Sequence, residues 1–212
     1  MLAKVKCFAL NGLEGIGVDV EADVSNGLPS CDIVGLPDAA VKESRERVRS
    51  AVKNSGFRFP THKVTVNLAP ADLKKEGAHF DLAIAMCLLR ATGQVVFFAP
   101  DLVFLGELAL DGSLRPIQGI LPILISARAA GYRTFFVPAQ NANEASYLSG
   151  IRVYPVRSLA EAVNHLGGEA AIEPVKERVF AASACDERFD LSLVKGQRVA
   201  KRALEIAVAG GH

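Results

Sequence analysis

The sequence predicts an α+β fold in which antiparallel strands come first and strand–helix units follow. Three observations support this class. Residues 15–24 alternate apolar with polar side chains, which is the period-2 pattern of a strand with one buried face. Residues 63–90 place another alternating segment and a polar turn before an apolar helix. From residue 133 onward, short apolar runs alternate with helical segments, which favours parallel strands joined by right-handed crossovers.

Residues 4–36 are expected to form antiparallel strands, with Asn26 and Gly27 supplying a turn. One face of the second strand carries three carboxylates, those of Asp19, Glu21 and Asp23. A hard metal ion could bind such a row, but side chains two apart on a strand diverge into solvent and no further ligands accompany them. We therefore favour a solvated face over a metal site.

The clearest helix is predicted over residues 38–55, with Asp38 as its N-cap and Gly56 as its stop. Four basic side chains fall within about 80° of one another on this helix at 3.6 residues per turn: Lys42, Arg45, Arg49 and Lys53. They are the best candidates in the sequence for contacts with nucleic-acid phosphates. The alternative is a solvated flank balanced by Glu43 and Glu46, which the residues alone favour.

Residues 63–90 contain the segment around which the chain is organised. Residues 63–69 alternate as a strand does, and Pro70 ends the strand because it cannot donate to a ladder. Residues 82–89 are apolar nearly all round, as in a helix buried on most sides. A Lys-Glu-Gly turn precedes this helix. Since a helix N-terminus carries partial positive charge, the junction is a natural position for a nucleophile or an anion.

The second half of the chain begins with a hairpin within residues 104–117, whose turn is Asp111 and Gly112. A short apolar helix is predicted over residues 119–130. Strands and helices then alternate: strand 133–138, helix 142–149, strand 152–156 and helix 158–166. Ser158 and Glu161 make a capping box at the start of the last helix.

Three segments are expected along the chain. Residues 1–167 form the first domain, and residues 168–189 form a linker because they mix charged and small residues without sustained periodicity. Residues 190–212 begin a second module with a helix that has Val199, Ala203 and Ile206 on one face. The Gly-Gly-His run at residues 210–212 indicates that this module continues beyond the sequence.

Composition narrows the possible functions. The 212 residues include 24 basic and 23 acidic side chains, for a net charge of +1, so any nucleic-acid contact must rest on a local patch. With no Trp and three Tyr, an aromatic platform for stacked bases is not expected. The four cysteines lack metal-ligand spacing, and no stretch is apolar enough for a signal peptide or a membrane span. We expect a cytoplasmic protein with no metal site.

The last segment carries a resemblance. DLSLVKGQRVAKRALEIAVAGGH, residues 190–212, is similar to the segment before the Walker A loop of the magnesium-chelatase-like AAA+ ATPases of the YifB/ComM family. The resemblance implies that the phosphate loop follows residue 212. ATP and Mg2+ would then be cofactors of a longer parent protein, with no cofactor held by this chain alone. It also places three weak candidates near the adenine: Val194, Gly196 and Gln197.

The first 166 residues resemble that family's N-terminal domain, which is similar to the proteolytic domain of Lon. KKEGAHFDLAIAMC, residues 74–87, matches the Lon segment that carries the nucleophilic serine. LGELALDGSLRPIQGILPILISARAAGY, residues 105–132, matches the segment that carries its lysine partner. On this alignment His79 stands at the serine position and Leu121 at the lysine position. A Ser–Lys dyad needs both groups, so no peptidase activity is expected.

The resemblance implies a non-catalytic accessory domain of an ATP-driven ring motor that acts on DNA, in branch migration during uptake and recombination. Its partners would be its own AAA+ module, further copies in a hexameric ring and DNA, without a membrane. One alternative is an ATP-dependent peptidase with an atypical site at His79. The other is a magnesium-chelatase-type ATPase subunit, which we rank lower because the motifs shared with chelatases are expected in the ATPase module.

Overall fold

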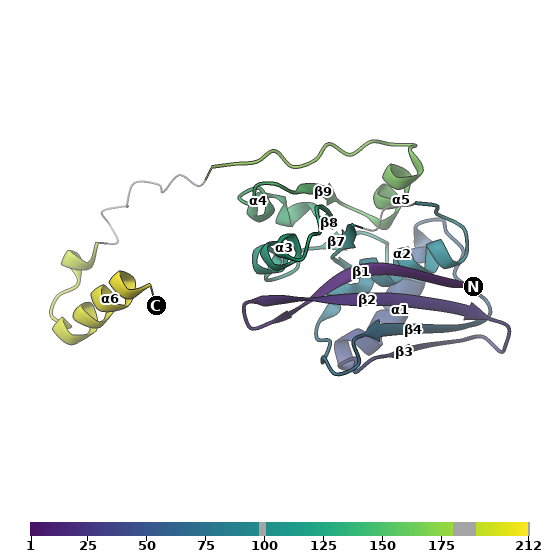
Figure 1. Cartoon of the computed structure of the whole chain (residues 1–212), viewed down its shortest axis with the longest axis horizontal. Coiled ribbons are helices and arrows are strands. Elements are labelled where there is room, and N and C mark those ends of the chain that lie inside the picture. Colours follow the sequence, from purple (N-terminus) through teal and green to yellow (C-terminus); the bar gives the residue numbers. More distant parts are fainter. Residues whose placement is uncertain (98–100, 180–189, 212) are drawn as a thin grey trace. The chain divides into compact units, whose positions relative to one another are not determined.

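A computed structural model describes residues 1–97, 101–179 and 190–211 of the chain. The chain divides into two compact units, Met1–Arg178 and Val179–His212. The first unit is built on a seven-stranded sheet with the strand order β3-β4-β2-β1-β5-β8-β9 (Figure 1).

The strands of this sheet are β1 (Leu2–Asn11), β2 (Glu14–Ser25), β3 (Ser30–Val34), β4 (Lys63–Ala69), β5 (Leu102–Phe104), β8 (Thr134–Pro138) and β9 (Arg152–Val156). A separate hairpin consists of β6 (Glu107–Leu108) and β7 (Leu114–Arg115). The helices are α1 (Ala39–Asn54), α2 (Asp81–Ala91), α3 (Ile120–Ala129), α4 (Ala142–Ala145), α5 (Leu159–Gly167) and α6 (Arg198–Gly210). Short 3-10 turns among the described residues include η1 (Ala78–Phe80), η2 (Ala139–Asn141) and η4 (Leu191–Leu193).

The sheet is mixed and mostly parallel. Strand β2 pairs antiparallel with β1 and β4, whereas β3–β4, β1–β5, β5–β8 and β8–β9 pair in parallel. The expected parallel pairing after residue 133 is confirmed. The prediction of antiparallel strands throughout residues 4–36 is wrong for β3. That strand leads through α1 into β4, and a crossover helix returns the chain in the parallel direction.

Helices cover both faces of the sheet; α1 and α2 lie on its far side in Figure 1. Helix α2 is buried along ten of its eleven residues, as its apolar sequence predicts. The Cys87 thiol lies 3.2 Å from the Val20 carbonyl oxygen of β2. On the opposite face, Gly15 lets α3 approach closely, because a Cβ there would lie 3.0 Å from the Ile123 Cα. The Gly15 N–H also donates to the Ser126 hydroxyl at 2.9 Å.

Lysines of β1 and the N-terminal amine pair with the acidic row of β2. The Asp19 carboxylate lies 2.7 Å from the Lys6 ammonium and 3.0 Å from that of Lys4. The Glu21 carboxylate accepts a hydrogen bond from the Asn67 amide at 2.9 Å. Within the described ranges, no group of three or more His, Cys, Asp or Glu side chains could hold a metal ion. The row is therefore an ion-paired face.

The first unit extends eleven residues beyond the predicted boundary at 167. Residues 168–178 have no helix or strand but are bonded to the unit. The Val175 N–H donates to the Val153 carbonyl of β9 at 2.8 Å, and the Arg178 N–H donates to the Ser146 carbonyl at 2.8 Å. These long-range bonds leave no periodic pattern in the sequence. Residues 180–189 of the predicted linker lie outside the described residues.

The second unit contains η4 and α6. Its helix begins at Arg198 and includes the predicted apolar positions. No residue of α6 is buried within the described chain, and Val199 is 85% exposed. Across the parts of the chain that the structure describes, no helix is both long and apolar enough to cross a membrane.

Candidate functional site

The start of α1 is held by Asp38. One oxygen of its carboxylate accepts the Val41 N–H at 2.7 Å, which confirms the predicted N-cap. The other oxygen accepts the Gly77 N–H at 3.2 Å. Asp38 therefore ties α1 to the Lys-Glu-Gly turn that precedes α2, a second contact that helix-cap statistics do not predict.

The inner face of α1 is fixed by a buried ion pair. The Arg47 guanidinium donates two hydrogen bonds to the Asp81 carboxylate, at 2.7 and 3.2 Å. Asp81 is fully buried and also accepts the Leu108 N–H at 3.2 Å. Burial raises the pKa of Asp81, which the guanidinium opposes, and the carboxylate in turn raises the pKa of Arg47. At 3.6 residues per turn, Arg47 points roughly opposite to the predicted basic stripe, so the pair turns that stripe outward.

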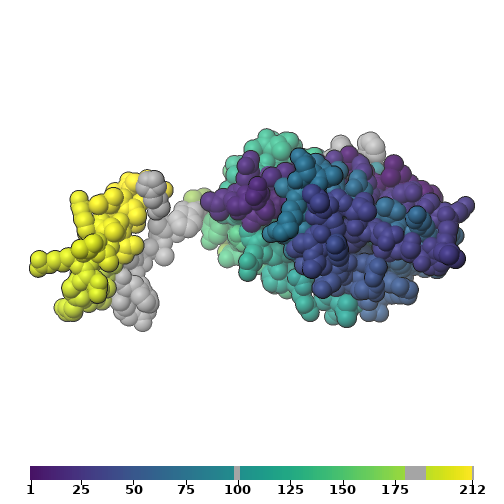
Figure 2. All heavy atoms as spheres, turned by 90° about the horizontal axis from the view of Figure 1, so that it is seen from below, coloured from purple at the N-terminus to yellow at the C-terminus, as the bar shows by residue number. Residues whose placement is uncertain are grey.

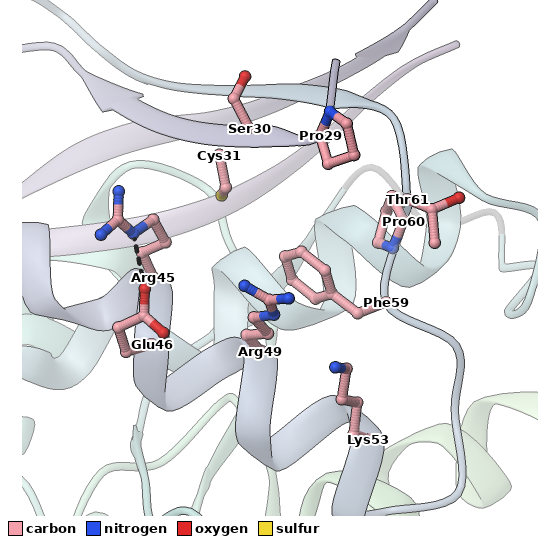
Figure 3. Close-up of a pocket in the computed structure, with 10 residues that line it drawn as sticks. All are labelled: Pro29, Ser30, Cys31, Arg45, Glu46, Arg49, Lys53, Phe59, Pro60 and Thr61. Atoms are coloured by element: carbon pink, nitrogen blue, oxygen red, sulfur yellow. Dashed lines mark hydrogen bonds and ion pairs between the residues drawn. The ribbon is translucent and has the colours of Figure 1, made fainter. Parts of the chain in front are cut away.

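The outer face of α1 forms one wall of a concave surface, which we name the α1 groove. Figure 2 views the first unit from the side of α1 and β3. All four predicted basic residues are exposed there. A hollow of about 460 Å³ separates α1 from β3 and the segment after α1 (Figure 3). Its walls are Arg45, Glu46, Arg49 and Lys53 on α1, and Pro29, Ser30, Cys31, Phe59, Pro60 and Thr61 opposite. Lys42 lines an adjoining hollow of about 440 Å³ with Arg45.

The cations of the α1 groove are only weakly engaged by the rest of the chain. Arg45 contacts the Glu46 carboxylate at 3.0 Å, but both side chains are about half exposed or more, and such pairs contribute little. The Arg49 guanidinium lies over the Phe59 ring, 5.9 Å from its centroid. The structure thus brings the predicted stripe together and gives it an opposite wall that the sequence analysis missed. The Phe59-Pro60 pair beside a predicted helix was the only local indication of that wall.

The positions of the resembled dyad hold no catalytic pair. His79 lies in η1, and its buried Nε2 atom has no hydrogen-bond partner within the described chain. Burial lowers the pKa of His79 to about 4, so the imidazole is neutral at pH 7. Leu121 lies in α3, packs against the core, and donates its backbone N–H to the Glu144 carboxylate at 3.2 Å. Asp81, near His79 in sequence, is committed to Arg47 and cannot orient the imidazole.

The two lysines of the Lys-Lys-Glu-Gly turn before His79 have different environments. Lys74 is exposed and ion-paired with Glu76. Lys75 is fully buried, and its ammonium donates to the Pro70 carbonyl. Burial lowers the pKa of Lys75. Its backbone N–H also donates to the Leu36 carbonyl at 3.1 Å, so this lysine holds the turn against the end of β3 and is not open to a phosphate.

The weak adenine-side candidates lie in the second unit, just before α6. Val194, Gly196 and Gln197 are exposed, and the last two have positive φ values of 71° and 51°. They turn the chain into the helix. Their role beside a nucleotide stays a prediction.

Fold and site together define a mixed α/β domain that presents a basic groove and lacks the hydroxyl and the amine of a peptidase dyad. A family model described as subunit ChlI of Mg-chelatase matches residues 20–141. The chain belongs to this magnesium-chelatase-like family. The match lies within the first unit, so the expectation that the chelatase likeness would reside in the ATPase module is wrong.

Individual relatives refine this assignment. The chain is 42% identical over 216 residues to competence protein ComM of Haemophilus influenzae and 41% identical over 212 residues to YifB of Escherichia coli. Both matches cover all of this chain but only 42% and 41% of the relatives, so the chain spans about two fifths of their length. A weaker match, 28% over 188 residues, relates 83% of the chain to 23% of Lon protease from Mycolicibacterium smegmatis.

Proposed function

We propose that this chain is a non-catalytic accessory domain of an ATP-driven, DNA-acting ring motor, and that the α1 groove is its DNA contact. One observation carries the proposal: four cations on one helix face line a single concave surface. Their charges are presented together by a rigid element, because Asp38 and the Arg47–Asp81 pair fix α1 at both its start and its inner face. Clustered cations of this kind bind phosphates by displacing counterions.

The name of one relative, competence protein ComM, supports the DNA role, because competence concerns the uptake of DNA. A ring motor, with ATP and Mg2+ as its cofactors and a hexamer as its assembly, is proposed for the longer parent. The accessory status of this chain rests on His79 and Leu121, which supply neither the hydroxyl nor the free amine that acyl transfer needs.

A magnesium-chelatase-type ATPase subunit is the second candidate, and the description of the matching family model favours it. It differs from the first in what stimulates ATP hydrolysis by the longer protein. Stimulation by a porphyrin and not by DNA would support the chelatase role. Stimulation by DNA alone would support the ring motor.

DNA binding tests the groove. Fluorescence anisotropy of labelled DNA would compare this chain with a variant in which Lys42, Arg45, Arg49 and Lys53 are replaced by Ala. A matched control removes four exposed arginines on other elements: Arg115, Arg133, Arg152 and Arg157. We expect the first variant to lose binding and the control to keep it. Equal binding by the two variants would refute the α1 groove as the contact.

The peptidase alternative has its own test. Incubation of the longer protein with casein and ATP, with enzyme in excess, should give no cleavage. Cleavage that disappears in His79→Ala would overturn the non-catalytic assignment.

A further inference from the structure

The α1 groove continues beyond the hollow of Figure 3 in both directions. The hollow shares Cys31 and Arg45 with the one at Lys42. At its other end it shares Lys53 and Phe59 with a third hollow of about 480 Å³, which reaches Arg58 and Gln94. Three adjoining hollows therefore follow the outer face of α1 from its first turn to its last, over about 16 Å at 1.5 Å per residue.

The charge of this groove differs from that of the chain as a whole. Five basic side chains line the three hollows, namely Lys42, Arg45, Arg49, Lys53 and Arg58. Two acidic ones, Asp32 and Glu46, accompany them. The groove therefore has three more basic than acidic side chains, whereas the whole chain has a net charge of only +1. A long basic groove is complementary to an extended polyanion.

The shape of the groove discriminates between the two forms of DNA. A helix that reads a duplex must project from its surroundings, since it has to enter a major groove about 12 Å wide. Helix α1 does not project in this way: its basic side chains point into a hollow whose other wall is β3 and residues 59–61 (Figure 3). A single strand, by contrast, can lie along such a trough with its phosphates on the basic wall.

The wall opposite α1 suits unpaired bases. It is formed by Pro29, Cys31, Phe59 and Pro60, which carry no charge. The Arg49 guanidinium lies over the Phe59 ring. It provides a second planar group beside the ring, on which a base can stack. The scarcity of Trp and Tyr argues against a large aromatic platform, but one Phe–Arg stack is enough to hold one base.

We infer that the α1 groove binds one unpaired strand of DNA, with its phosphates along α1 and its bases toward Phe59 and the segment beside it. This rests on the proposed DNA function and specifies its ligand. The other occupant that the geometry admits is an extended peptide added to β3, which is the last strand at its edge of the sheet. At the opposite edge, Val175 already bonds to β9. The excess of basic over acidic side chains favours the nucleic acid.

The test measures binding of a short oligothymidine and of a duplex of the same length at one salt concentration. We expect the single strand to bind at least tenfold more tightly. Cys31→Trp, at the position of β3 whose side chain points toward α1 (Figure 3), fills the hollow without changing its charge and should weaken single-strand binding about tenfold or more. Ser149→Trp, at an exposed position after α4, is the control and should leave it unchanged.

A second variant separates stacking from charge. Arg49→Lys keeps the cation but removes the planar guanidinium, and it should weaken single-strand binding about fivefold or more because a stacked base is lost. Binding of the duplex should be unaffected. Circular dichroism melting of each variant establishes that it is folded.

Three results would overturn the inference: equal or tighter binding of the duplex, no effect of Cys31→Trp on the single strand, or displacement of the strand by a Glu-rich peptide at lower concentration than by oligothymidine. The first two leave the proposed function standing if replacing the four α1 cations by Ala still abolishes DNA binding. A different result would refute the proposed function itself: the variant with the four α1 cations replaced by Ala would bind both the single strand and the duplex as tightly as the parent chain.

Discussion

Replacing His79 by Leu should remove a large part of the acid sensitivity of this fold. Burial lowers the pKa of His79 to about 4, whereas an imidazole in the unfolded chain has a pKa near 6.5. Above pH 6.5 the imidazole is neutral in both the folded and the unfolded chain, so its titration does not reduce the free energy of unfolding. As the pH falls from 6.5 toward 4, the unfolded chain binds a proton that the folded chain excludes, so stability is lost.

The size of this effect follows from the pKa difference. At about 1.36 kcal/mol per pKa unit, His79 should lower the free energy of unfolding by roughly 2–3 kcal/mol between pH 7.5 and pH 4.5. The His79→Leu variant should not show this part of the loss on acidification, while the parts that come from all other titratable groups should remain. At pH 7.5 the free energy of unfolding of His79→Leu should lie within about 1 kcal/mol of the parent's. The reason is that the buried Nε2 has no hydrogen-bond partner among the described residues to lose.

Urea unfolding at the two pH values, followed by circular dichroism, measures the difference. His62→Leu is the control because His62 is exposed. If His79→Leu and the parent lose the same free energy on acidification, the buried, structural assignment of His79 is wrong. An imidazole that titrates near its ordinary pKa would be open to solvent and available for chemistry.

Two further predictions concern the anchoring of α1. Arg47→Ala leaves the Asp81 carboxylate buried without its counter-charge and should cost about 3–5 kcal/mol in urea unfolding, while the exposed Arg115→Ala should cost less than about 1 kcal/mol. Similar losses in the two variants would contradict the buried pair. Asp38→Ala removes both a helix cap and the bond to the turn before α2, and should cost about 1–2 kcal/mol, more than the simple cap variant Ser158→Ala. A smaller loss than in Ser158→Ala would mean that the second bond contributes nothing.

Features set by neighbouring residues could be predicted from the sequence. The cap at Asp38 is confirmed by its bond to Val41, and the hairpin at Asp111 and Gly112 forms as expected. Gly112 has a φ of +88°, the conformation that such a turn requires. Each of these depends on contacts within a few positions along the chain, which is the range over which residue patterns carry information.

Features set by distant residues could not be predicted. The three-residue strand β5 is fully buried between β1 and β8, and so short a run has no period to detect. Helix α4 has only four residues where residues 142–149 were expected to be helical. Lys75 is buried because the turn folds back against the end of β3, a contact about forty positions away in sequence.

The candidate site divides in the same way. The basic stripe follows from helical spacing alone, and the structure places its four residues together. The groove required a wall from Pro29, Cys31 and Phe59, which come from two segments that meet α1 only in the folded chain. The orientation of α1 required the Arg47–Asp81 pair, whose partners are 34 positions apart.

The salt dependence of DNA binding by this chain tests the central claim most directly. If the four α1 cations each neutralise one phosphate of a single strand, the plot of log K against log salt should have a slope of about −3, from roughly 0.7 per phosphate. Replacement of the four by Ala should bring the slope close to zero, while the control with four other arginines replaced keeps it. A slope that is the same in both variants would contradict the assignment of the α1 groove as the DNA contact.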